Sequence, residues 1–192
     1  MDDNSPAITV AILGVSLVEY ELEKILRNRS HHKDDDTWME VTSINGPLSG
    51  LHAKIIAGYA FGLYGSFFKD LLHTLRNVRN AFAHSKKLVD FQNEVILKTL
   101  RDVRNLDKSK KKNSELSKGV KYVSEKASGQ NPEGKDAFVN LIYVILLHFR
   151  KLETKSLKRQ VVRLKTKLAR VTANKSPNRG FPFSGSSRSH LG

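Results

Sequence analysis

The residues with the clearest potential for chemistry lie close together, in the stretch Arg79-Asn80-Ala81-Phe82-Ala83-His84. An arginine binds phosphate oxygens through two N–H groups at once. A histidine titrates near neutral pH, so it can accept or donate a proton. At about 100° per residue, a helix through this stretch has an apolar face and an opposite polar face. The polar face is rich in groups that bind ligands or transfer protons, namely His73, Arg76, Asn77, Asn80 and His84.

Four short stretches resemble the mannitol-operon repressor (MltR) family, and the resemblance covers about residues 5–105. The resemblance implies a transcriptional regulator, and it does not extend beyond residue 105. It identifies no operator, and no residue indicates mannitol as a ligand. The stretches are Asn45–Ser49, Ala53–Ile55, Ala60–Leu63 and Val78–Ser85.

The spacing Arg-x4-His also resembles the signature of HEPN domains, which are small helical bundles. Many HEPN domains are metal-independent ribonucleases that act across a dimer cleft. The resemblance implies that Arg79 would stabilise phosphate charge and that His84 would move a proton to or from a ribose 2′-hydroxyl. Asn80 would orient one of the two.

A structural role accounts for the same residues as well. His84 falls near the predicted end of the helix, ahead of Lys86 and Lys87, where basic groups offset the helix dipole. The stem of Arg79 can cover apolar surface. Positions five apart differ by about 140° around a helix, so Arg79 and His84 are not expected to share a face. A capping role, a polar binding site and a ribonuclease site therefore all stay open.

The pattern of apolar residues predicts an all-α fold with about five helices. Repeats at three- and four-residue spacing predict helices over 6–29, 51–63, 67–83, 91–103 and from 133 or 136 to 172. The third has a buried stripe of Leu71, Leu75, Val78 and Phe82, and the second points Ile55, Ile56, Tyr59 and Leu63 inward. We expect a helical bundle domain over 1–150 with a basic loop at 106–133, a projecting basic helical extension over 151–175, and a disordered tail over 176–192.

Composition excludes several classes of protein. The 192 residues include no cysteine, which excludes disulfides and thiolate metal sites and fits a reducing cytoplasm. The first residues are acidic, and the apolar stretch 7–18 is shorter than the roughly 20 residues that span a bilayer. We expect a cytoplasmic protein that is neither secreted nor inserted in a membrane.

A second group of candidate ligands lies at His31-His32 and Asp34-Asp35-Asp36. Adjacent ligands rarely close one coordination shell, so a hydrated loop is the favoured interpretation over a metal site. We expect neither a metal nor another cofactor. The single tryptophan, Trp38, is interpreted as an anchor in the core or a loop.

The net charge of +14 is concentrated in two segments, 107–126 and 150–175. Residues 107–126 carry 7 basic and 3 acidic side chains. Residues 1–106 carry 13 basic and 13 acidic side chains, whereas residues 150–175 carry 10 basic and 1 acidic. Charge of one sign attracts polyanions, and Lys and Arg contacts to phosphate carry no sequence information. The predicted nucleic-acid-binding residues are Lys155, Lys158, Arg159, Arg163, Lys165, Lys167 and Arg170.

An apolar stripe runs through the same basic segment, at Leu157, Val161, Leu164, Leu168 and Val171. Its alternating spacing of four and three is typical of a helix that pairs with another helix. The hypothesis is a regulatory or nucleic-acid-associated protein of the MltR type, without enzymatic activity, whose partner is the backbone of DNA or RNA. A metal-independent ribonuclease and a protein-interaction module are the alternatives, and a homodimer stays open.

Overall fold

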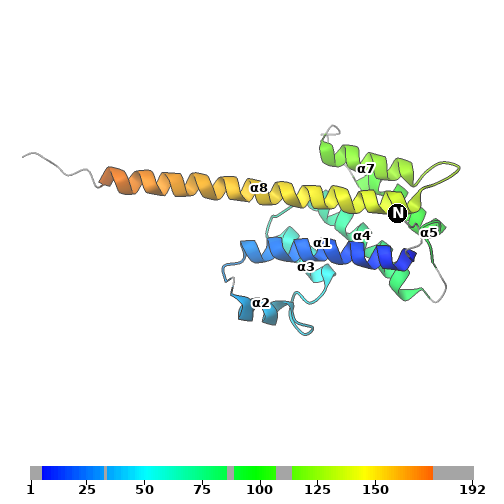
Figure 1. Ribbon diagram of the computed structural model, residues 1–192, viewed down its shortest axis with the longest axis horizontal. Coiled ribbons are helices and arrows are strands. Elements are labelled where there is room, and N and C mark those ends of the chain that lie inside the picture. Colours follow the sequence, from blue (N-terminus) through cyan, green and yellow to red (C-terminus); the bar gives the residue numbers. More distant parts are fainter. Residues whose placement is uncertain (1–5, 33, 86–88, 107–113, 175–192) are drawn as a thin grey trace, which may run out of the picture. The chain divides into compact units, whose positions relative to one another are not determined.

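The computed structural model describes residues 6–32, 34–85, 89–106 and 114–174. This part of the chain is all-α, as predicted, and contains no strand. The helices are α1 (Ala7–Arg29), α2 (Asp35–Thr42), α3 (Leu51–Ala60), α4 (Ser66–His84), α5 (Glu94–Arg101), α6 (Val103–Leu106), α7 (Glu115–Lys126) and α8 (Gly134–Asn174) (Figure 1). The chain divides into two compact units, unit 1 over residues 1–154 and unit 2 over residues 155–192. The predicted tail at 176–192 lies outside the described residues.

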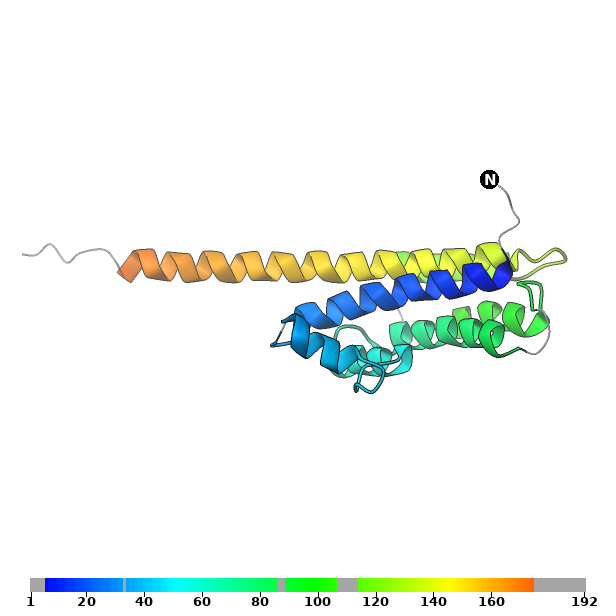
Figure 2. The same ribbon diagram turned by 60° about the horizontal axis from the view of Figure 1, so that its bottom comes forward.

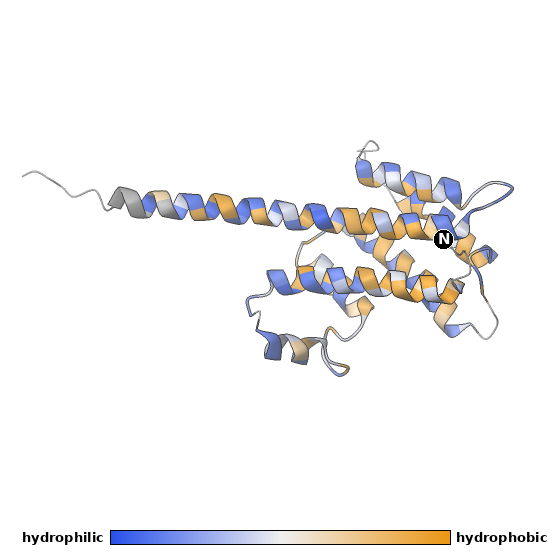
Figure 3. Ribbon diagram, in the orientation of Figure 1, coloured by the Kyte–Doolittle hydropathy of each residue, from blue (hydrophilic) through white to orange (hydrophobic). Residues whose placement is uncertain are grey.

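The core of unit 1 lies where α1, α3, α4 and the first part of α8 meet. The buried stripe predicted for α4 is confirmed, since Leu71, Leu75, Val78 and Phe82 are all at most 4% exposed. Figure 2 shows α1 alongside the first part of α8. The two helices approach closely at Gly14, where a β-carbon would collide with the side chain of Ile142. Apolar residues are concentrated in this first part of α8, while polar residues recur along its second half (Figure 3).

The prediction of a loop over 106–133 is wrong where residues 115–126 form α7, and residues 107–113 lie outside the described part of the chain. Four apolar side chains recur at helical spacing among the lysines and serines and face the core. Ser114 caps the helix by accepting a hydrogen bond from the Ser117 N–H at 3.1 Å. The basic composition concealed a short amphipathic helix, whose inward residues are Leu116, Val120, Val123 and Ala127.

The segment between α1 and α3 also contains an unexpected helix, α2. Asp34 caps it by accepting a hydrogen bond from the Thr37 N–H at 2.9 Å. Trp38 is buried, and its indole Nε1 donates to a Glu23 carboxylate oxygen at 3.2 Å. Trp38 therefore anchors α2 to α1, as its interpretation as an anchor predicted.

The inward face predicted for α3 is correct in part, since Ile55 and Leu63 are buried. Ile56 and Tyr59 were predicted to face inward, but they are 42% and 43% exposed. Lys54 takes an inward position instead and is 5% exposed. Lys54 can be buried there because its ammonium group has two carboxylate partners on α1.

Candidate functional site: a polar cleft and a basic helical segment

A cleft of about 400 Å³ opens along the polar face of α4. The apolar face of α4 is fixed in the core, so its opposite face turns toward the start of α3 and the middle of α1. The cleft, called the polar cleft below, is lined by Arg76, Arg79, Asn80 and His84 of α4, Val15, Ser16 and Glu19 of α1, and Ser49, Gly50, Leu51 and His52 at the start of α3.

Four of the six predicted residues of the α4 polar face and motif therefore come together in one site. Arg79 and His84 both line it, although their angular separation predicted different faces. The expectation was wrong because α1 and α3 flank α4, so the cleft covers a wide arc that long side chains can reach. His73 and Asn77 do not line the cleft.

Asn80 contacts the neighbouring arginine directly. The Nη1 group of Arg79 donates to the Oδ1 atom of Asn80 at 3.3 Å. Both side chains are partly buried. This contact limits the positions that the guanidinium can take in the cleft, and it leaves most of the guanidinium N–H groups for a ligand.

Glu19 and its buried partner Lys54 were not among the predicted site residues. The Lys54 Nζ atom lies 2.8 Å from a carboxylate oxygen of Glu19 and 2.8 Å from one of Glu23. Burial lowers the pKa of Lys54, but the hydrogen bonds and charges of the two carboxylates outweigh it, so the pKa is raised overall. The ammonium group stays charged and holds Glu19 at the edge of the cleft. Two glutamates four apart on α1 were the only sequence signal for this arrangement.

His52 is a second missed residue, and it links the cleft to His73. The two imidazole rings lie 5.3 Å apart between centroids. Burial lowers the pKa of His73, and the nearby His52, Lys69 and Arg76 add to the effect. The neutral form of His73 is therefore favoured at neutral pH, and its uncharged ring lies next to the ring of His52.

The start of α3 adds a further attraction for anions. No side chain caps this helix in the described part of the chain, and its first N–H groups lie beside the cleft at Gly50, Leu51 and His52. The N-terminus of a helix carries partial positive charge. Together with Arg76 and Arg79, this gives the cleft the groups that bind a phosphate, opposed by the single carboxylate of Glu19.

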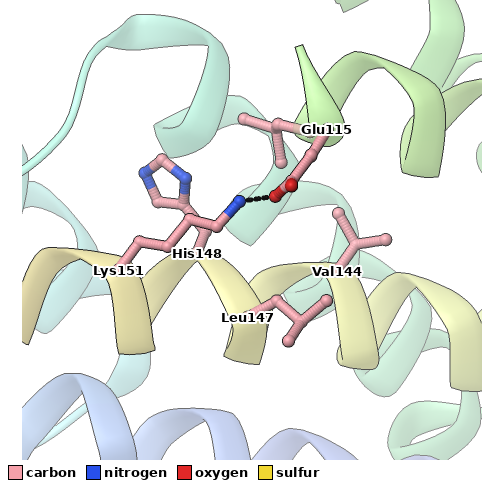
Figure 4. Close-up of a pocket in the computed structure, with 6 residues that line it drawn as sticks. Glu115, Val144, Leu147, His148 and Lys151 are labelled. Atoms are coloured by element: carbon pink, nitrogen blue, oxygen red, sulfur yellow. Dashed lines mark ion pairs between the residues drawn. The ribbon is translucent and has the colours of Figure 1, made fainter. Parts of the chain in front are cut away.

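A smaller pocket of about 40 Å³ lies between α7 and α8 (Figure 4). An ion pair between Lys151 and Glu115 bridges it, and the His148 ring stacks on Phe68 with centroids 4.1 Å apart. Burial lowers the pKa of His148. The ion pair joins α7 to α8, and the ring contact joins α8 to α4. Lys151, at the start of the predicted extension, therefore has an acidic partner within unit 1.

The basic helical segment, residues 155–170, is part of α8 and of unit 2. It contains no acidic residue. All of its basic side chains are exposed, and they are the seven predicted nucleic-acid-binding residues, Lys155, Lys158, Arg159, Arg163, Lys165, Lys167 and Arg170.

The acidic residues near His31 and His32 make local contacts. Asp34 caps α2, and Asp35 pairs with Arg27 of α1. Within the described ranges, no group of three or more histidine, aspartate or glutamate side chains is placed to hold a metal ion. None of the helices in the described part of the chain is long and apolar enough to span a membrane.

Comparison with known proteins gives no match: no family model, no curated protein and no solved structure is significantly similar to this chain. The resemblances to MltR and to HEPN domains therefore stay predictions.

Proposed function

We propose that this chain is a nucleic-acid-binding regulatory protein without enzymatic activity, which contacts the phosphate backbone through its basic helical segment. The observation that carries the proposal is the seven exposed cations between residues 155 and 170, in a segment without any acidic residue. A solvated helix face usually mixes both signs of charge, whereas a surface for a polyanion carries one. The resemblance to MltR supports the regulatory role.

Backbone contacts of this kind give affinity without sequence preference. Neutralising Lys158, Arg159, Arg163 and Lys165 with glutamine is therefore expected to weaken binding to unrelated DNA and RNA duplexes alike. The matched control removes the same charge from exposed positions of unit 1, with glutamine at Arg29, Lys98, Arg104 and Lys118. Equal losses of affinity in the two variants would mean that binding depends on the net charge of the chain and not on the basic helical segment.

RNA cleavage is a second candidate function, and the polar cleft favours it. In the reaction, a base removes the proton of a ribose 2′-hydroxyl and the 2′-oxygen attacks phosphorus. The bond to the 5′-oxygen breaks as an acid protonates that oxygen, which leaves a 2′,3′-cyclic phosphate. His84 and His52 would serve as base and acid, and Arg79 would stabilise the charge that develops on the phosphate oxygens.

The two functions are separated by incubating purified protein with RNA in EDTA. A ribonuclease of this type cleaves without metal and loses activity in His84→Ala, while His31→Ala, outside the cleft, serves as the control. Our proposal predicts no cleavage by any of the three proteins. Cleavage that depends on His84 would replace the binding function with the enzymatic one.

A further inference from the structure

The basic helical segment has a second face that phosphate binding does not use. At about 100° per residue, its seven cations cover an arc of about 200°. Leu157, Val161 and Leu164 lie together on the opposite side, and they are 61%, 50% and 65% exposed. Three large aliphatic side chains left in water on one narrow stripe indicate a surface that another molecule covers.

We propose that this apolar stripe binds the same stripe of a second copy of the chain, in a short, parallel two-stranded coiled coil. The inference goes beyond the proposed function, because it does not depend on nucleic acid. Written as a heptad, the spacing places Val161 at position a and Leu157 and Leu164 at position d. A β-branched residue at a with leucine at d favours parallel dimers over higher oligomers.

The charges beside the stripe select the parallel orientation. In a parallel pair, each g residue faces the e residue five positions further along the partner, so Gln160 faces Lys165 of the second copy. In an antiparallel pair, e residues face one another, which sets Lys158 against Lys165 twice. The parallel arrangement avoids this repulsion between like charges.

The stripe suits a second copy better than the other partners of such a helix. It has no aromatic residue that could stack on unpaired bases. It also lacks the Trp or Phe that anchors amphipathic helices in a membrane surface. Pairing leaves Lys155, Arg159 and Arg163 at the outer positions b, f and c, so two basic surfaces face outward from one coil.

Sedimentation equilibrium of the full chain in high salt, without nucleic acid, tests the pairing. High salt screens the repulsion between the two basic helices, so the dimer fraction is expected to rise with salt. Leu164→Glu should weaken dimerisation about tenfold or more, because it places a carboxylate in the seam. Thr166→Glu adds the same charge at the outward position f and should leave the dimer intact. A chain that stays monomeric, or a dimer that Leu164→Glu does not weaken, overturns the proposal.

Disulfide trapping tests the orientation, since the chain has no natural cysteine. A parallel coil in register places each seam residue opposite itself, so Leu157→Cys and Leu164→Cys should each form a linked dimer in a glutathione buffer. Arg159→Cys, on the outer face, should not. An antiparallel coil instead links a mixture of Val161→Cys and Leu164→Cys into the mixed dimer, and that result overturns the parallel arrangement.

Discussion

At the scale of single residues, Lys54 connects the core of unit 1 to the polar cleft. Its ammonium group is buried between Glu19 and Glu23, and only Glu19 lines the cleft. The side chain therefore decides both how α3 is oriented against α1 and where a carboxylate stands beside the phosphate-binding groups. A ligand that enters the cleft meets a negative charge that the fold holds in place.

Replacing Lys54 with methionine should destabilise the chain by about 1–3 kcal/mol, because two partly buried carboxylates lose their shared partner. Chemical denaturation measures the loss. Lys24→Met is the control, since Lys24 also pairs with two glutamates but its side chain is 47% exposed. Equal stability of Lys54→Met and the parent chain would show that the buried ion pairs contribute nothing net.

The stability of the fold depends on pH through His148 and His73. Burial lowers the pKa of both below the ordinary value of 6.5. The unfolded chain therefore binds protons at a higher pH than the folded chain. Their contribution to stability is complete above pH 6.5 and is lost as the pH falls through the folded pKa values.

Melting temperatures measured between pH 7.5 and 5.5 test this prediction. The parent chain should lose stability over that interval, and His148→Gln should lose less, because one of the two groups no longer titrates. His31→Gln, in an exposed position, should follow the parent chain. A His148→Gln profile as steep as that of the parent would contradict the assignment.

The residues of the candidate site were predictable where one helix carries them. Arg76, Asn80 and His84 follow from the polar face of a single amphipathic helix, and Arg79 follows from the Arg-x4-His spacing. His52 and Glu19 could not be found in the same way, because they belong to the site only through the packing of α1 and α3 on α4. No spacing within one segment records that packing.

At the scale of elements, long periodic patterns predicted α1, α4 and α8. The short helices α2 and α7 were hidden, because eight and twelve residues rich in charge give too few apolar repeats to stand out from a loop. Each of them has a side-chain cap and buried apolar residues that hold it in place, such as Trp38 in α2 and Val120 and Val123 in α7. Tertiary packing, more than local propensity, stabilises such helices.

A carboxylate in the buried face of α7 tests whether that helix is part of the core. Val123 is fully buried, so Val123→Asp should cost at least about 3 kcal/mol of unfolding free energy. Lys118→Asp introduces the same side chain at an exposed position of α7 and should cost much less. If both variants have the unfolding free energy of the parent chain, α7 does not pack on the rest of unit 1.

At the scale of the whole molecule, the hydrophobic core and the one-signed charge lie in different units. Unit 1 provides the core and the polar cleft, and unit 2 provides an exposed helical segment with seven cations. The uneven charge was readable from the sequence, because it needs only a count along the chain. The boundary between the two units, after Thr154, was harder to predict from the sequence. Lys151 is basic like its neighbours and yet pairs with Glu115 of unit 1.

The salt dependence of nucleic-acid binding tests the central claim most directly. If about five phosphates are neutralised on duplex DNA, log K against log salt should have a slope near −4.5, from about 0.9 per phosphate. Glutamine at Lys158, Arg159, Arg163 and Lys165 should flatten that slope, while Arg76→Ala or Arg79→Ala should change affinity less. The opposite ranking would move the site to the polar cleft, and binding without any dependence on salt would contradict the proposed function.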